Sequence, residues 1–144
     1  MITALDIDTF ARTLWGEARG EVFEGILAVG WVIMNRYNRP GWWSRNKGDG
    51  IPDDTIAATC RDPMQFSCWN ENDPNREKLI NVTLDDSAFQ KCYYIALRLS
   101  LEYEKNDPTH GSCHYHTANV MPKWAQGKIP VYTIGDHRFY NNVN

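Results

Sequence analysis

The chain has 144 residues, of which 42% are hydrophobic and 23% charged, and its formal net charge is −3. These values are ordinary for a soluble globular protein, and we expect residues 1–144 to fold as a single domain. A negative net charge without a basic run excludes broad electrostatic capture of nucleic acid, so we expect no nucleic-acid partner. The six Trp, seven Tyr and five Phe favour an uncharged glycan, because flat rings stack on sugar faces.

The first predicted helix begins near residues 8–9 and runs to about Ala18. Phe10, Leu14 and Glu17 recur on one face at helical spacing. Glu17 therefore lies on the apolar face, where burial disfavours the charged carboxylate and raises its pKa. A carboxyl group that stays protonated near neutral pH is what a general acid needs. The structural alternative is a glutamate of the last turn that reaches water or pairs with a neighbouring arginine.

A second helix covers the apolar run 26–34 and ends at Pro40. It is apolar on nearly every side, so we expect it to be the central buried helix. The long polar loop over residues 42–54 follows, and a loop of this length is usually functional or mobile. Its Trp42 and Trp43 are candidates for sugar platforms or for the hinge of a lid.

Two further helices are predicted in the middle of the chain. A short one covers residues 55–60 with Asp54 as its cap, and irregular backbone follows over residues 61–75. The next helix begins at residues 85–87. Its apolar stripe consists of Phe89, Cys92, Tyr93, Ala96, Leu99 and Tyr103.

The C-terminal part has a different composition. Residues 113–117 and 129–134 are short and rich in β-forming side chains. The sequence therefore predicts an α+β fold that is mainly helical and carries a small C-terminal β element.

The spacing of the four cysteines does not by itself identify a disulfide pattern or a metal site. Cys60, Cys68, Cys92 and Cys113 form no close CxxC pair, which makes zinc weakly supported. Cys92 falls on the apolar stripe and is expected to be a packed free thiol. A bridge between Cys60 and Cys68 stays open for a protein that works outside the cytosol. Cys60, Cys68 and Cys113 are also candidate nucleophiles if a histidine activates the thiol, and Cys68 is the one that follows a turn.

A glycosidase site needs a second group besides the acid. Glycoside cleavage requires a proton donor for the leaving oxygen and then a nucleophile. Glu21, Glu24, Asp54 and Asp136 are candidates for a second carboxylate. None of them is clearly paired with Glu17, and this favours a mechanism in which a hydroxyl of the substrate is the nucleophile.

Two alternatives compete with the glycosidase. His110, Cys113, His114 and His116 lie close together and, with a distant His137 or Cys68, would hold the zinc of a peptidoglycan amidase or peptidase. The structural reading is that these histidines make hydrogen bonds near a cleft. No HExxH or paired CxxC supports the metal site, so we expect no metal and no organic cofactor. The other alternative is a particle component that binds glycan without cutting it.

The chain resembles the SleB-type cell wall hydrolases, a family of spore cortex-lytic enzymes and of phage, prophage and gene-transfer-agent lysins. The resemblance rests first on residues 15–21, Trp-Gly-Glu-Ala-Arg-Gly-Glu, and on residues 24–36. Three later blocks agree in order: residues 65–67, residues 114–116 with Trp124, and residues 134–140. Residues 42–54 are longer than the usual connection, and the cysteines are not part of the pattern.

The resemblance implies a lysozyme-like domain related to lytic transglycosylases. These enzymes cleave the peptidoglycan bond between N-acetylmuramic acid and N-acetylglucosamine with one glutamate, which corresponds to Glu17 here. It also implies that Gln65 and Ser67 line the glycan cleft, and that Tyr115 and His116 face this cleft from the β element. The expected partner is therefore the peptidoglycan glycan strand.

Other matching residues are interpreted as structural: Trp124, Gly135 and His137, with Arg19 anchoring the helix turn. Residues 1–8 lack the basic start and apolar run of a secretory signal, and the run 26–34 is too short to cross a bilayer. We therefore expect a protein made in the cytoplasm without membrane insertion. It would reach the wall through a lysis pore or on a phage or phage-like particle.

Overall fold

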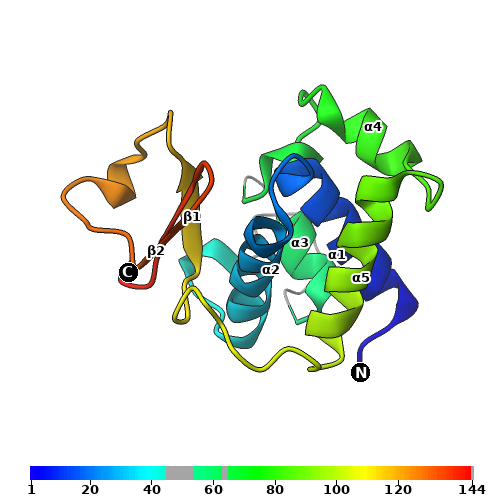
Figure 1. Cartoon of the computed structure of the whole chain (residues 1–144), viewed down its shortest axis with the longest axis horizontal. Coiled ribbons are helices and arrows are strands. Elements are labelled where there is room, and N and C mark those ends of the chain that lie inside the picture. Colours follow the sequence, from blue (N-terminus) through cyan, green and yellow to red (C-terminus); the bar gives the residue numbers. More distant parts are fainter. Residues whose placement is uncertain (45–53, 63–64, 144) are drawn as a thin grey trace.

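The computed structural model describes residues 1–44, 54–62 and 65–143. Its helices and strands are α1 (Ala4–Ala18), α2 (Phe23–Asn38), α3 (Ile56–Arg61), α4 (Asn75–Asn81), α5 (Ser87–Ser100), β1 (His114–Thr117), β2 (Tyr132–Ile134) and β3 (His137–Tyr140). Short 3₁₀ turns are η1 (Trp42–Ser44), η2 (Ser67–Trp69) and η3 (Lys123–Ala125). Figure 1 shows the helices grouped together and the small sheet to one side of them. The predicted α+β class is confirmed.

Helix α1 begins earlier than the sequence predicted. The Thr3 hydroxyl accepts the Asp6 backbone N–H at 3.2 Å, and Asp6 Oδ2 accepts the Thr3 N–H at 2.9 Å. This reciprocal capping box satisfies two donors that the helix end leaves unpaired. The predicted start near residues 8–9 was wrong because it left out this pair. Asp6 Oδ1 also accepts the Ala57 N–H at 3.0 Å, which ties the first turn of α3 to α1.

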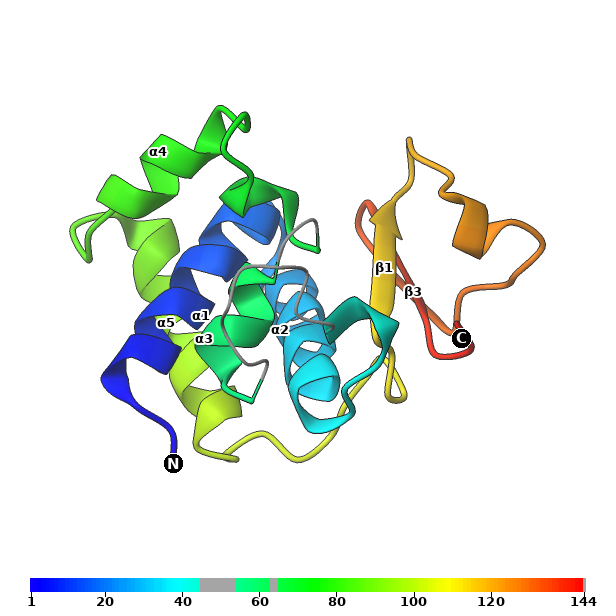
Figure 2. The ribbon, with the colours of Figure 1, turned by 180° about the vertical axis from the view of Figure 1, so that it is seen from behind.

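Helix α2 is the central helix, as predicted. It lies between the other helices and the sheet in both Figure 1 and Figure 2. Gly30 allows its close approach to α5, because a Cβ at this position would lie 2.5 Å from Leu99 Cδ1. The helix ends at Asn38, two residues before Pro40. Its fully buried apolar side chains are Ile26, Ala28, Val29, Val32 and Ile33.

The shorter helices depart from the sequence prediction in detail. Thr55 and not Asp54 caps α3, since its Oγ1 accepts the Ala58 N–H at 3.0 Å. Helix α4 had no counterpart in the prediction. Of the predicted loop over residues 42–54, the part from 45 to 53 lies outside the described residues.

Helix α5 is capped by Asp86, whose Oδ1 accepts the Phe89 N–H at 2.9 Å. The predicted stripe is buried at Phe89, Cys92 and Leu99. Tyr103 lies beyond the end of the helix and is 66% exposed, so its place in the stripe was wrong.

The sheet is antiparallel with the order β1-β3-β2. Phe139 of β3 is opposite Tyr115 of β1 and Tyr132 of β2, and it is fully buried in the core. This face of the sheet therefore packs toward the helices. The prediction gave β1 and β2 but did not identify β3.

The four cysteines are buried free thiols, so the structure does not contain the Cys60–Cys68 bridge. Cys92 packs in the core, as predicted. Among the described residues, no helix combines the length and the apolar character needed to cross a membrane.

Candidate active site

Glu17 lies in the last turn of α1, and its side chain is half-buried. The 3₁₀ turn η2 packs directly against this part of α1. Trp69 Nε1 donates a hydrogen bond to Thr13 Oγ1 at 2.8 Å, and a Cβ at Gly16 would lie 2.7 Å from the Cβ of Cys68. The glycine at position 16 therefore allows η2 to lie beside the turn that carries Glu17.

Tyr115 approaches Glu17 from β1. Its ring stacks on Phe139 with 5.7 Å between centroids and meets the edge of His137 at 5.1 Å. These contacts fix the ring, and the Tyr115 hydroxyl acts as a hydrogen-bond donor to the Glu17 carboxylate. Burial raises the pKa of Tyr115 well above its usual value, so the phenol keeps its proton at neutral pH.

Arg36 of α2 brings a positive charge to the same place. Its guanidinium donates from Nε to the Cys113 carbonyl at 2.6 Å and from Nη1 to Gln65 Oε1 at 3.2 Å. It also lies 5.0 Å above the Phe66 ring. Arg36 is only 6% exposed and thus connects α2, the start of β1 and the segment before η2.

The pKa of Glu17 is set by opposing effects. Their sum raises it from an ordinary 4.5 to about 7, with burial as the largest cause and the negative charge of Asp73 acting in the same direction. The hydrogen bond from Tyr115 and the positive charge of Arg36 act in the other direction, because both stabilise the carboxylate. A carboxyl group with a pKa near 7 can give up a proton and take one back at neutral pH. A single residue that acts first as the acid and then as the base needs this property.

Asp73 was not among the predicted carboxylates. Its Oδ1 accepts the Asn75 N–H at 2.8 Å, and Asn75 Oδ1 accepts a hydrogen bond from Arg19 Nη2 at 3.0 Å. Arg19 in turn lies 4.1 Å above the ring of Trp15 in α1. The turn that carries Asp73 is thereby tied to α1 near Glu17. This agrees with the interpretation of Arg19 as an anchor.

Glu21 has a different partner. Its Oε1 lies 2.7 Å from His137 Nδ1 and accepts the Asp136 N–H at 3.3 Å. A Cβ at Gly135, where φ is +52°, would lie only 2.9 Å from the same oxygen. Glu21 therefore holds the turn between β2 and β3 against the end of α1. The other predicted carboxylates, Glu24, Asp54 and Asp136, are exposed.

Two predicted binding residues lie at the start of η2: Gln65 just precedes this turn, and Ser67 is its first residue. Gln65 is half-buried and bonds to Arg36, with no hydrogen bond to Glu17 among the described contacts. Ser67 opens η2 and is exposed, next to the Cys68 that contacts Gly16. Both positions lie beside the Glu17 turn, where the resemblance expects the glycan cleft.

His116 does not face Glu17, and the expectation that it shares a face with Tyr115 was wrong. Successive side chains of a strand point to opposite faces. His116 Nε2 lies 2.8 Å from the Tyr140 hydroxyl and Nδ1 lies 2.7 Å from the Thr117 carbonyl. Its ring stacks on Tyr140 and meets Trp124 at 5.8 Å. Trp124 therefore packs over this second face, in keeping with its structural interpretation.

The structure gives less support to the two alternative sites, the cysteine nucleophile and the zinc site. Burial raises the pKa of the Cys68 thiol far above its usual value, which disfavours the thiolate that a nucleophile needs. In the ranges that the structure describes, no three His, Cys, Asp or Glu side chains converge as metal ligands.

Sequence reasoning missed two residues of this site. Arg36 follows Val29, Val32 and Ile33 at helical spacing, so the pattern already put a cation on the buried face of α2. Asp73 lies in a polar turn, and nothing in the local sequence indicates that it lies near Glu17.

The comparisons with known proteins identify the family and the fold of this chain. A family model described as Cell Wall Hydrolase matches residues 20–140, a range that begins just after α1. The spore cortex-lytic enzyme of Halalkalibacterium halodurans is 27% identical over 137 residues, which are 94% of this chain and 34% of that protein. The spore cortex-lytic enzyme of Bacillus subtilis is 24% identical over 136 residues, 93% of this chain and 37% of that protein. The chain thus spans about a third of the length of these curated relatives.

Two solved structures share the fold. One is the catalytic domain of the germination-specific lytic transglycosylase SleB from Bacillus anthracis, with a TM-score of 0.67 and 24% identity, covering 96% of both chains. The other is the catalytic domain of the Bacillus cereus SleB protein, with a TM-score of 0.67 and 22% identity, covering 98% of this chain and 93% of that one.

Proposed function

Because the chain belongs to the Cell Wall Hydrolase family, we propose that it degrades peptidoglycan as a lytic transglycosylase. The bond cleaved joins N-acetylmuramic acid to N-acetylglucosamine. The observation that carries the proposal is the half-buried Glu17, whose pKa is raised to about 7, chiefly by burial, and which Tyr115 contacts from β1. The activity named for the Bacillus anthracis SleB domain, which has the same fold, supports it.

The proposed reaction uses Glu17 twice. The protonated carboxyl group gives its proton to the glycosidic oxygen as the bond from muramoyl C1 to this oxygen breaks. The carboxylate that remains is stabilised by the Tyr115 hydroxyl and the charge of Arg36. It then takes the proton of the muramoyl C6 hydroxyl while that oxygen bonds to C1, which gives a 1,6-anhydro sugar and restores the acid.

A hydrolytic variant of the reaction has a candidate base in Asp73. Water would then take the place of the C6 hydroxyl, and a second carboxylate would activate it. One oxygen of Asp73 already accepts the Asn75 N–H, so the carboxylate has a structural task in its turn. We therefore assign Asp73 to the tuning of Glu17 and expect the anhydro product.

The experiment that tests the proposal is a digest of purified peptidoglycan with products identified by mass spectrometry. Fragments that end in 1,6-anhydro-muramic acid are expected. Fragments with a reducing muramic acid would contradict transglycosylation and make Asp73 the first candidate for a base. Cleavage of amide bonds would overturn the glycosidase, and pelleting with walls without soluble fragments would favour the glycan-binding alternative.

The route to the wall is a separate proposal. We propose that the protein acts after release through a lysis pore or after transport on a phage or phage-like particle, as the sequence led us to expect. Detection of the protein in purified particles would support the second route. Export through the general secretion pathway in cells without a lysis pore would contradict both.

A further inference from the structure

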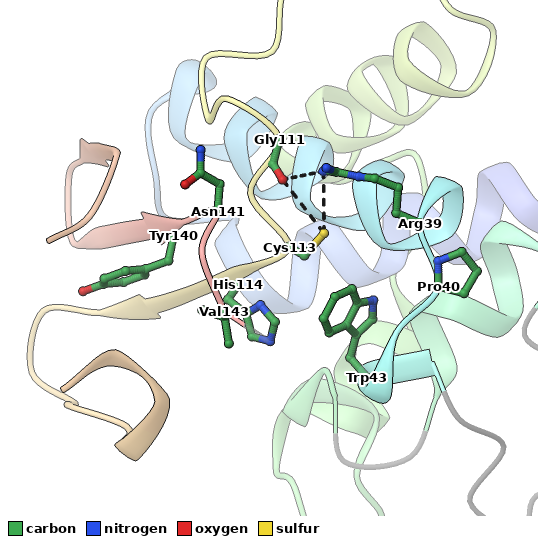
Figure 3. Close-up of a pocket in the computed structure, with 9 residues that line it drawn as sticks. All are labelled: Arg39, Pro40, Trp43, Gly111, Cys113, His114, Tyr140, Asn141 and Val143. Atoms are coloured by element: carbon green, nitrogen blue, oxygen red, sulfur yellow. Dashed lines mark hydrogen bonds between the residues drawn. The ribbon is translucent and has the colours of Figure 1, made fainter. Parts of the chain in front are cut away.

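The end of helix α2 holds the segment that leads into β1. Three successive backbone carbonyls, at residues 111–113, accept hydrogen bonds from side chains at this end of the helix. The three pairs are Asn35 Nδ2 with Ser112 at 2.9 Å, Arg36 Nε with Cys113 at 2.6 Å, and Arg39 Nη2 with Gly111 (Figure 3). We call this set of contacts the α2 clamp.

The α2 clamp acts next to an edge strand. In the sheet order β1-β3-β2, strand β1 pairs with β3 alone, so its outer edge has no strand neighbour in the part of the chain that the structure describes. Backbone carbonyls that no strand pairs need other donors. Helix α2 is also the helix that packs most closely against β1. The clamp therefore determines where the first residues of β1 lie relative to the helices.

Asn35 of the clamp is itself fixed by a carboxylate. Its amide nitrogen donates a second hydrogen bond to Asp107 Oδ2 at 2.8 Å, and the residue is only 9% exposed. Asp107 also accepts the Gly111 N–H at 2.9 Å and the N–H and hydroxyl of Thr109 at 2.8 and 2.6 Å. A carboxylate only accepts hydrogen bonds, so Asn35 must turn its NH₂ group toward Asp107. The same NH₂ group then reaches the Ser112 carbonyl.

Tyr115 follows the clamped segment closely. It is the second residue of β1 and lies two positions after Cys113, so its place depends on where residues 111–113 are held. Its ring packs on Phe139 and His137, which belong to the same sheet. Its hydroxyl, in contrast, bonds to Glu17 on α1. This hydrogen bond joins the sheet to a helix, and a hydrogen bond weakens steeply when its geometry is disturbed.

We infer that Asn35 and Asp107 are positioning residues, which hold β1 where the Tyr115 hydroxyl reaches the catalytic carboxyl group. Among the described contacts no hydrogen bond joins either side chain to Glu17, so both act through the backbone of residues 111–115. The inference rests on the proposed function, in which this carboxyl group is first the acid and then the base.

The titration of Glu17 in the free protein tests this inference without any substrate. The full chain is labelled with carbon-13 at the glutamate carboxyl carbons, and the Glu17 resonance, identified by its loss in Glu17→Gln, is followed by NMR between about pH 4 and pH 9. The groups that act on this carboxyl group come from four segments: Tyr115 of β1, Arg36 of α2, Cys68 of η2 and Asp73 of the turn before α4. Asn35→Ala changes no charge, so a shifted midpoint reports changed contacts.

Asn35→Ala should raise the midpoint of the Glu17 titration by about 0.5 pH unit or more, roughly a threefold change in proton affinity. The reason is that the bond from Tyr115, which stabilises the carboxylate, becomes weaker. Tyr115→Phe already lacks this bond, so Asn35→Ala should cause no further rise in that background. If Asn35→Ala does not fold, Asn35→Ser keeps a polar group at this position and takes its place with the same expectations.

Thr3→Ala is the matched control. It also changes no charge, and it removes capping hydrogen bonds at the other end of α1, so it should lower the stability and leave the Glu17 midpoint unchanged. The inference is overturned if a folded Asn35 variant moves the midpoint no more than Thr3→Ala does. It is also overturned if the shift is equally large with and without the Tyr115 hydroxyl, or if Tyr115→Phe itself causes none.

The digest of peptidoglycan is a separate measurement. A protein that shows the expected titrations but releases no glycan fragments would contradict the proposed function and leave the positioning of Tyr115 in place. Lytic activity together with an unshifted midpoint in the Asn35 variant would contradict the positioning alone.

Discussion

The Tyr115 hydroxyl meets the carboxyl group of Glu17, although one residue lies on the first strand and the other on the first helix. Desolvation makes the Glu17 carboxylate unfavourable, while Tyr115 and Arg36 stabilise it. The balance brings the pKa of Glu17 to about 7, a value that suits one group acting first as acid and then as base. The sheet thus contributes directly to the chemistry of a residue on a helix.

This pKa predicts the pH dependence of cleavage. The folded enzyme donates its proton only from the neutral carboxyl group, and this form is lost as the pH rises through about 7. We therefore expect kcat/KM to be constant below this pH on the Glu17 limb and to fall about tenfold per pH unit above it. Initial rates on purified peptidoglycan between pH 5 and 9 measure this limb. A rate that stays flat through pH 9 would contradict the assignment of Glu17 as the acid.

Asp73→Asn should move the alkaline limb to lower pH. The negative charge of Asp73 raises the pKa of Glu17, and its removal favours the carboxylate. Asparagine keeps an oxygen that can accept the Asn75 N–H, so the turn should be preserved. The pH–rate profile is compared with that of Asp85→Asn, a change at an exposed aspartate. An unshifted limb in Asp73→Asn would show that Asp73 does not act on Glu17.

Tyr115→Phe should move the same limb in the opposite direction. Phenylalanine preserves the stacking on Phe139 but removes the hydrogen bond that stabilises the Glu17 carboxylate. The pKa of Glu17 should rise, and the maximal rate should fall by roughly tenfold or more, because the base form loses a charge-assisted bond. Tyr132→Phe, on the neighbouring strand β2, is the control. A limb that moves to lower pH would contradict the role assigned to the Tyr115 hydroxyl.

Much of this arrangement follows from periodicity. The spacing of Phe10 and Leu14 put Glu17 on the buried face of α1, and the apolar run of α2 predicted the central helix. These patterns are local, and burial of an apolar face is the dominant favourable term in folding. The pattern of short β-forming segments gave β1 and β2 in the same way.

The features that were not predicted from the sequence depend on contacts between distant segments. Asp73 acts on Glu17 only because Arg19 and Asn75 join its turn to α1. His116 was expected to face the cleft together with Tyr115. Neighbouring side chains of a strand point to opposite faces, so the sequence pattern itself already argued against this expectation. Glu21 looked like a second carboxylate, yet its partner His137 lies at the other end of the chain. A single sequence without related sequences does not reveal such pairs.

The Glu21 contact gives a prediction about stability. The Glu21 and His137 side chains are 17% and 5% exposed, so the pair is partly shielded from water. Glu21→Ala leaves His137 Nδ1 and the Asp136 N–H without this acceptor and should lower the free energy of unfolding by about 1–3 kcal/mol. Chemical denaturation at pH 7 measures the loss. Glu24→Ala, at an exposed glutamate on α2, should change it by less than about 0.5 kcal/mol; equal losses in both variants would argue against the Glu21 contact.

The central claim is that Glu17 is the group that transfers the proton. Its most direct test is the rate at which wild type, Glu17→Gln and Glu24→Gln release soluble glycan fragments from purified peptidoglycan at one protein concentration and pH. Glutamine fills the same space but has no proton to give, so Glu17→Gln should lose about 10²- to 10⁴-fold in rate while Glu24→Gln keeps the wild-type rate. A folded Glu17→Gln variant that cleaves as fast as wild type would contradict the account.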